Sequence, residues 1–108
     1  MAYGKLGTVV TTANTNHTVY TVPSNCLYAE ISINILNRDT TDSIVKLAIG
    51  SSATPNTQDY IEDGAIVPGS GGVLERDSLI AGPGELIVVN TSVSGSVVRV
   101  SGKEVTKN

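Results

Sequence analysis

Apolar and polar residues alternate most regularly between residues 26 and 50. In CLYAEISINILN the apolar residues that would share one face of an extended strand are Ala29, Ile31, Ile33 and Ile35. After the polar bridge NRDTTDS the chain returns as IVKLAIG, where Val45, Leu47 and Ile49 share a face. The Asn, Asp and Thr side chains of the bridge are suited to bond to the backbone of a turn. We therefore predict two strands that pair as an antiparallel hairpin with one face in the core.

The rest of the chain repeats this pattern in short segments rich in Val, Ile and Thr, which favour strands. Further strands are predicted over residues 6–12, 17–22, 59–63, 72–76, 85–90 and 96–105. Gly, Pro, Asn and Asp separate these segments, and no long window has helical periodicity. A short helical turn around Asn56–Tyr60 would lack a capping pattern.

Many short strands without a long helix are typical of a β-sandwich. We predict an all-β, single-domain antiparallel β-sandwich over residues 1–108, jelly-roll or immunoglobulin-like, with about eight short strands. A chain of 108 residues is long enough to bury one modest core.

Charge and composition argue against nucleic acid and membrane partners. The net charge is −3, and the basic residues are spread along the chain: Lys5, Arg38, Lys46, Arg76, Arg99, Lys103 and Lys107. No run approaches the roughly 20 apolar residues of a membrane helix, and the first residues lack the apolar region of a signal peptide. Cys26 is the single cysteine, which excludes an intrachain disulfide. We expect a protein made in a reducing cytoplasm.

Residues suited to catalysis are few. His17 and Cys26 would form a nucleophilic dyad only if the fold brought them together, and an inert buried cysteine is the commoner outcome. A glycosidase needs only two carboxylates, and the candidates are Asp59, Glu75 and Asp77, of which Glu75 and Asp77 would share a face of one strand. However, the chain has no Trp to stack on a sugar, and solvated surface carboxylates are the norm.

Two acidic groups offer the oxygen ligands that calcium prefers. They are Asp39 with Asp42, and Asp59 with Glu62 and Asp63. Neither group has the spacing of an EF-hand loop. We expect no catalytic, metal or cofactor site, and we predict that the protein is not an enzyme.

Three stretches resemble small virion proteins of tailed bacteriophages: LYAEISINILNRDT, DYIEDGAIVPGSGGVLERDSLIAGPGELIVV and VVRVSGKE. The resemblance spans residues 20–104. It implies a structural component of the particle, in the first place a capsid decoration (cement) protein that stabilises the head by binding the capsid surface. The alternative is a tail or fibre accessory protein with a carbohydrate- or host-binding sandwich. Tyr28 and Tyr60 are the aromatic residues that such a site would expose.

The same resemblance implies residence in the virion, assembly as a trimer, and the major capsid protein or another virion protein as partner. Residues 1–12 take no part in the resemblance and form a candidate docking or oligomer-contact segment. Leu6, Val9 and Val10 are its predicted interface residues. A strand over these residues has two alternative partners: it pairs within its own sandwich, or it pairs with an edge strand of a neighbouring subunit.

Overall fold

The computed structural model describes residues 3–107 and confirms the predicted all-β class. Its strands are β1 (Tyr3–Val10), β2 (His17–Thr21), β3 (Cys26–Leu36), β4 (Ser43–Gly50), β5 (Tyr60–Val67), β6 (Val73–Ala81), β7 (Leu86–Thr91) and β8 (Val97–Thr106). A 3-10 turn, η1 (Thr57–Asp59), lies within residues 56–60, where the sequence showed no capping pattern to support a helical turn. The Asp59 carboxylate caps it by accepting a hydrogen bond from the N–H of Asn56 (3.1 Å).

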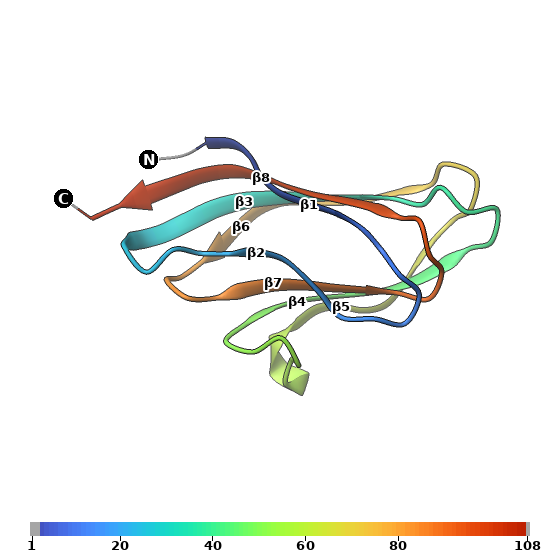
Figure 1. Ribbon diagram of the computed structural model, residues 1–108, viewed down its shortest axis with the longest axis horizontal. Helices are drawn as coiled ribbons and strands as arrows, with labels where there is room; N and C mark the ends of the chain where they lie inside the picture. Colours follow the sequence, from blue (N-terminus) through green and yellow to red (C-terminus); the bar gives the residue numbers. More distant parts are fainter. Residues whose placement is uncertain (1–2, 108) are drawn as a thin grey trace.

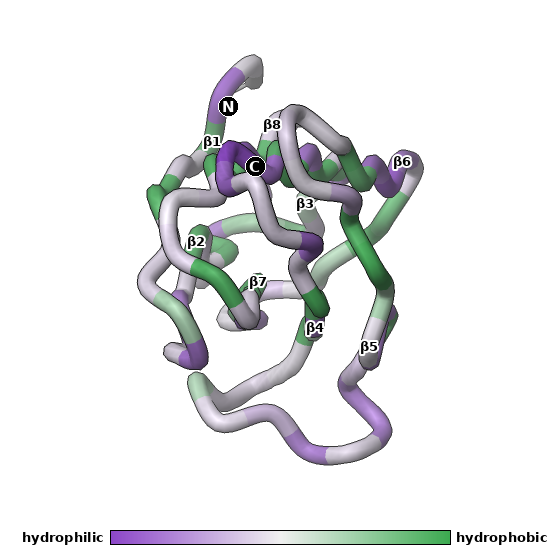
Figure 2. The backbone as a smooth tube through the Cα atoms, turned by 90° about the vertical axis from the view of Figure 1, so that its right-hand side faces the viewer, coloured by the Kyte–Doolittle hydropathy of each residue, from purple (hydrophilic) through white to green (hydrophobic). Residues whose placement is uncertain are grey.

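The strands form two antiparallel sheets that face each other (Figures 1 and 2). One sheet has the order β1-β8-β3-β6 and the other has the order β2-β7-β4-β5. Figure 2, which looks along the long axis, shows the first sheet above the second. Consecutive strands change sheet everywhere except between β4 and β5, as in a jelly roll. The predicted sandwich is therefore confirmed, and its strand order is that of a jelly roll rather than of an immunoglobulin-like fold.

The inward faces of both sheets build one hydrophobic core. The predicted alternation places these residues correctly, because the following are all buried: Ala29, Ile31, Ile33, Ile35, Val45 and Leu47. Ile49, predicted on the same face as Leu47, is only partly buried at the margin of this core. Each fully buried aliphatic side chain contributes roughly 1.5–3 kcal/mol, so these two strands supply a large share of the folding free energy.

The predicted hairpin between the two strands of segment 26–50 is wrong. β3 pairs with β6 and β8, whereas β4 pairs with β5 and β7 in the opposite sheet. The bridge over residues 37–42 therefore crosses from one sheet to the other. Alternation identifies the buried face of a strand, but it does not identify the strand that lies beside it.

Asn37 holds this crossing in place. Its side chain is 0% exposed, and its Nδ2 donates hydrogen bonds to the carbonyl oxygens of Thr41 (3.0 Å) and Val67 (3.1 Å). Its Oδ1 accepts a hydrogen bond from the N–H of Asp39 (3.0 Å). Its backbone also bonds to residues 71–72. One side chain thus joins the β3–β4 crossing to the end of β5.

Three strands extend further than the sequence pattern predicted. β1 begins at Tyr3 rather than at residue 6, and β5 and β6 continue beyond their predicted ends at residues 63 and 76. The predicted end of β5 at residue 63 adjoins a bulge at Gly64, and the predicted end of β6 at residue 76 adjoins a bulge at Asp77–Ser78. An extra residue shifts the period-two alternation, so the pattern breaks off there although the strand continues.

Every edge strand of the two sheets carries a bulge. The extra residues are Leu6 in β1, Val19 in β2, Ile61 and Gly64 in β5, and Asp77–Ser78 in β6. Bulges twist an edge and hinder the addition of a strand from another molecule. β1 itself pairs with β8 of its own sandwich. The shape of the edges therefore favours contacts through the faces of the sheets over edge-to-edge pairing.

A hydrogen bond joins the two sheets at the end of the sandwich opposite Asn37. The buried Tyr20 of β2 donates its hydroxyl proton to the carboxylate of Glu104 in β8 (2.5 Å). Burial, and after it this carboxylate, raises the pKa of Tyr20 far above its usual value of 10. The phenol is therefore a hydrogen-bond donor throughout the neutral pH range.

We expect Tyr20→Phe to lower the free energy of unfolding by about 1–2 kcal/mol, because it leaves a partly buried carboxylate without its donor. Since the pKa of Tyr20 is raised in the folded state, the stabilisation from this bond is complete below about pH 10 and is lost as the pH rises above that value. The variant should therefore lose less stability between neutral and alkaline pH than the wild type. Urea denaturation at a neutral and at an alkaline pH measures these losses of stability. Tyr28→Phe is the control, because Tyr28 is half-buried. Equal losses in the two variants would contradict the assignment.

Candidate functional site

A row of aliphatic side chains crosses the outer face of the β1-β8-β3-β6 sheet. Its members are neighbours in register: Val10 of β1, Val97 of β8, Leu36 of β3 and Val73 of β6. Val10 is 57% exposed and Val73 is 48% exposed, while Val97 and Leu36 between them are partly exposed. Contiguous exposed aliphatic side chains are typical of surfaces that bind another macromolecule. These four residues are called the aliphatic row below.

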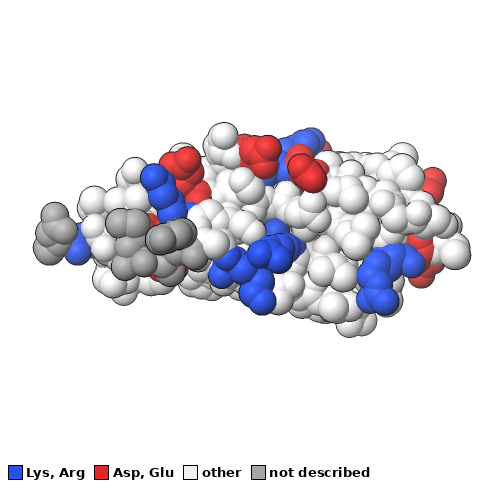
Figure 3. Space-filling model, turned by 90° about the horizontal axis from the view of Figure 1, so that it is seen from above, with Lys and Arg blue, Asp and Glu red and all other residues white. Residues whose placement is uncertain are grey.

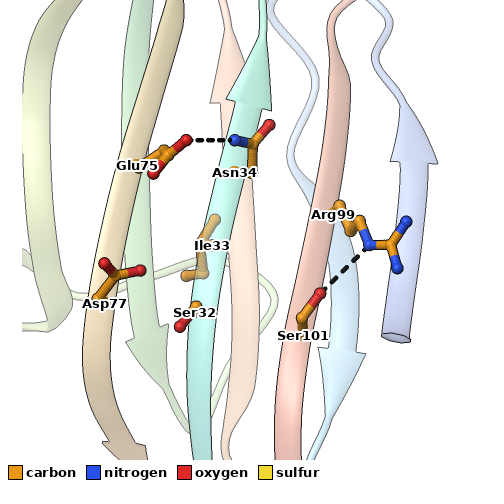
Figure 4. A pocket seen from close by; sticks show the side chains of 7 residues that line it. All are labelled: Ser32, Ile33, Asn34, Glu75, Asp77, Arg99 and Ser101. Atoms are coloured by element: carbon orange, nitrogen blue, oxygen red, sulfur yellow. Dashed lines mark hydrogen bonds between the residues drawn. The ribbon is translucent and has the colours of Figure 1, made fainter. Parts of the chain in front are cut away.

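A shallow polar hollow of about 150 Å³ lies beside the aliphatic row on the same face (Figure 4). Its lining comes from β3, β6 and β8: Ser32, Ile33, Asn34, Glu75, Asp77, Arg99 and Ser101. Asn34 Nδ2 donates a hydrogen bond to Glu75 Oε1 (3.0 Å), and Arg99 Nε donates one to Ser101 Oγ (3.2 Å). Figure 4 shows that these pairs lie along the sheet surface rather than converging on one point.

The two carboxylates of the hollow share a face of β6, as predicted. Glu75 and Asp77 both line the hollow, while Arg76 between them forms an ion pair with Glu62 of β5 in the other sheet. The hollow is smaller than the pockets of roughly 300–1,000 Å³ that hold small ligands. No aromatic side chain lines it. This geometry gives no support to a glycosidase site.

His17 and Cys26 are not brought together. His17 is the first residue of β2, and Cys26 begins β3 beyond the other end of β2 (Figure 1). The length of β2, roughly 15 Å, therefore separates the two residues. Cys26 is buried, and burial raises the pKa of its thiol. His17 Nε2 accepts a hydrogen bond from the N–H of Thr12 (2.9 Å). The dyad therefore has no geometric basis, and a buried thiol of raised pKa is unreactive.

The acidic groups considered as calcium ligands are engaged in local contacts. Asp39 and Asp42 accept hydrogen bonds from the N–H groups of Thr41 and Gly69, both 2.9 Å long. Ion pairs and a capping hydrogen bond engage the carboxylates of residues 59–63. Within residues 3–107, no three His, Cys, Asp or Glu side chains gather closely enough to hold a metal ion.

The predicted interface residues of the N-terminal strand occupy two environments. Leu6 and Val9 are partly buried and pack against the core. Val10 points outward as the first member of the aliphatic row. Their role in an interface stays a prediction, and Val10 is the residue of the three that is most accessible to a partner.

A second exposed aliphatic group lies on the outer face of the β2-β7-β4-β5 sheet. Ile44 and Ile66 are register partners on β4 and β5, and they are 52% and 68% exposed. Ile44 follows the crossing at residues 37–42, which begins after Leu36 of the aliphatic row. Both aliphatic groups therefore lie at the same end of the sandwich. Ile44 and Ile66 are called the β4-β5 patch below.

Apart from Val10, sequence reasoning missed the residues of both aliphatic groups, although some of them carried a signal. Leu36 continues the outward series of Ser32 and Asn34, so period two alone places it outside the core. Ile44 carried the same signal, because it shares a face with Lys46 opposite Val45 and Leu47, whereas Ile66 gave none, because the chain around it reads AIV. Alternation cannot assign a face where several apolar residues are adjacent.

Comparisons of the chain with protein-family models, curated proteins and solved structures found no match. Function is therefore inferred from the sequence pattern and from the geometry of the faces. None of the helical structure within residues 3–107 has the length and apolar character needed to cross a membrane.

Proposed function

We propose that the protein is a non-enzymatic structural component of a tailed-phage virion, and specifically a capsid decoration protein that binds the head surface. In this role it resides in the virion, and its partner is the major capsid protein or another virion protein. The proposal combines the sequence resemblance with the jelly-roll strand order. Jelly rolls occur in viral capsid proteins, and also in lectins and cupins, so the architecture is compatible with the role without selecting it.

The observation that carries the proposal is the exposed aliphatic surface at one end of the molecule. The aliphatic row and the β4-β5 patch lie on opposite outer faces at that end. A small protein with two such surfaces is suited to contact two neighbours at once. A decoration protein has this requirement, because it binds the capsid lattice and also meets other copies of itself.

We assign capsid binding to the β4-β5 patch. Ile44 and Ile66 form its centre, and the exposed ion pair between Lys46 and Asp63 lies beside it on the same two strands. An aliphatic centre with a polar rim is the usual composition of a protein-binding surface. The bulges at Ile61 and Gly64 keep the adjacent β5 edge from pairing with another strand, so docking involves the face of the sheet.

The double variant Ile44→Ser/Ile66→Ser is expected to weaken binding to capsids at least about ten-fold, because aliphatic contacts at the centre of an interface dominate its affinity. The fold should be unaffected, since both side chains are more than half exposed. Cosedimentation of the purified protein with particles that lack it measures the affinity. Leu27→Ser is the matched control, because Leu27 is equally exposed but lies at the start of β3, at the opposite end of the sandwich.

Wild-type binding by the double variant would contradict the assignment of the patch. A wild-type protein that binds no particle component would contradict the proposed function itself.

The alternative of a carbohydrate-binding tail or fibre accessory receives less support from the geometry. Tyr28 and Tyr60 are half-buried, and neither lines the polar hollow. Carbohydrate recognition on a sandwich generally depends on an exposed ring against which the sugar packs.

A further inference from the structure

The charged side chains on the outer face of the β1-β8-β3-β6 sheet are divided by sign. The basic side chains lie on β1 and β8: Lys5, Arg99 and Lys103. The acidic ones lie on β3 and β6: Glu30, Glu75 and Asp77. Figure 3 looks onto this face and shows acidic atoms toward its upper margin and basic atoms below them in the middle, with some basic atoms also beside the acidic ones at the upper margin and at the left. The two ion pairs formed among residues 3–107 use none of these six side chains.

The register of the strands arranges this face in transverse rows. Beyond the aliphatic row, the next row joins Thr8, Arg99, Asn34 and Glu75. The following row joins Lys5, Ser101 and Ser32, with the Asp77–Ser78 bulge opposite Ser32. A further row contains Lys103, Glu30 and Ile80. Each of these three rows therefore has its basic side chain on β1 or β8 and its acidic side chain on β3 or β6.

We propose that this face binds the same face of a second copy of the chain, related by a two-fold axis that runs parallel to the strands between β8 and β3. Such an axis places β1 over β6 of the second copy, and β8 over its β3. Each row then faces itself in reverse order. The aliphatic row packs on the aliphatic row of the second copy, with Val97 over Leu36.

The charges distinguish this axis from the other two-fold axis available in the plane of the sheet. With the axis parallel to the strands, Lys5 faces Asp77 of the second copy and Lys103 faces Glu30 of the second copy. With an axis across the strands, β8 would lie over β8, so the basic side chains would face each other. That axis would also place the aliphatic row over the opposite end of the face. The parallel axis matches apolar with apolar side chains in the aliphatic row and basic with acidic ones in the rows of Lys5 and Lys103, while Arg99 faces Asn34 of the second copy.

The size of the face is adequate for a specific dimer. Its strands contain 8 to 11 residues, which gives a sheet about 30 Å long and about 19 Å wide, or roughly 550 Å² in plan. Two such faces together amount to roughly 1,100 Å² in plan, which is just above the roughly 1,000 Å² in total that a specific interface buries. Face-to-face packing also leaves the bulged edges unpaired.

Sedimentation equilibrium of the wild-type chain should give the mass of a dimer. Leu36→Asp, at the centre of the aliphatic row, should raise the dimer dissociation constant at least about ten-fold. Leu36 is on the outward face, and circular dichroism should confirm that the variant keeps its fold. A monomer at millimolar concentration, or the mass of the trimer expected from the sequence resemblance, would overturn the two-fold proposal.

A series of charge-swap variants tests directly whether Lys5 of one copy faces Asp77 of the other. Lys5→Glu and Asp77→Lys should each weaken the dimer about ten-fold or more, since each places like charges opposite one another in two places. The double variant should restore the wild-type dissociation constant to within about three-fold. Lys5 and Asp77 lie on opposite edge strands of their own sheet, so an interaction within one chain cannot produce this restoration.

Lys46→Glu is the control for the change in charge, because Lys46 lies on the other sheet and should leave the dimer unchanged. Failure of the double variant to restore association would overturn the proposed axis. The inference goes beyond the virion role and is separable from it, since these measurements use the purified chain alone and capsid binding is measured through the β4-β5 patch.

Discussion

Gly102→Ala is expected to lower the free energy of unfolding by at least about 3 kcal/mol or to prevent folding. Gly102 lies within β8, between β1 and β3, with φ +149°. A Cβ atom there would overlap the carbonyl oxygen of Glu30 and lie 2.9 Å from the Cα of Ile31. Both neighbours are backbone atoms of β3, so β8 would have to move away from β3. That movement breaks ladder hydrogen bonds at the centre of the sheet, in addition to the strain of the unusual φ.

Gly95→Ala is the matched control for this variant. Gly95 also has a positive φ of +89°, but no atom lies within 4 Å of the position that its Cβ would take. Only the backbone strain remains there, and we expect a loss of about 1–2 kcal/mol. Urea denaturation of both variants measures the difference. Equal losses would show that the close approach of β8 to β3 is not a constraint on the fold.

Asn37→Ala is expected to cost about 3 kcal/mol. The variant removes three hydrogen bonds, and it leaves the buried carbonyl oxygen of Val67 and the N–H of Asp39 without that partner. An unsatisfied buried polar group costs roughly 1–3 kcal/mol, and the lost side-chain volume adds a cavity. The crossing at residues 37–42 should also become more accessible to proteases, because it loses its anchor to β5.

Asn90→Ala provides the comparison for this change. Asn90 makes one exposed hydrogen bond, from its Nδ2 to Asn16 Oδ1 (2.9 Å). We expect its loss to cost less than about 0.5 kcal/mol. Chemical denaturation and limited proteolysis of the two variants together test whether Asn37 has the structural role described. Indistinguishable behaviour of the two variants would contradict it.

Much of the fold was predictable from the sequence because period-two alternation is strong in several strands. Ile31, Ile33 and Ile35 alternate with polar residues, and their burial follows from that pattern. The partner of each strand was not predictable, because every core strand has the same kind of buried face. The sequence predicts a hairpin turn after Leu36 where the chain crosses between the sheets, since a buried Asn37 and a turn asparagine look alike in sequence.

The candidate sites depend more heavily on pairing than on local pattern. Glu75 and Asp77 share a face by alternation alone, but Asn34 and Arg99 join them only because β3 lies between β6 and β8. The aliphatic row depends on register in the same way, since its members come from four strands that are far apart in sequence. The division of charge on that face has the same origin. Composition and spacing contain no information on these neighbours until the topology is known.

The proposed role of the protein as a structural part of a phage head is tested most directly by the protein inventory of purified particles. Quantitative mass spectrometry of phage particles produced by the source of the chain gives both its presence and its copy number relative to the major capsid protein. We predict that the chain is present at a copy number comparable with that of the major capsid protein. Its absence from purified particles would contradict the claim, and a copy number typical of a tail fibre would replace decoration with the tail alternative.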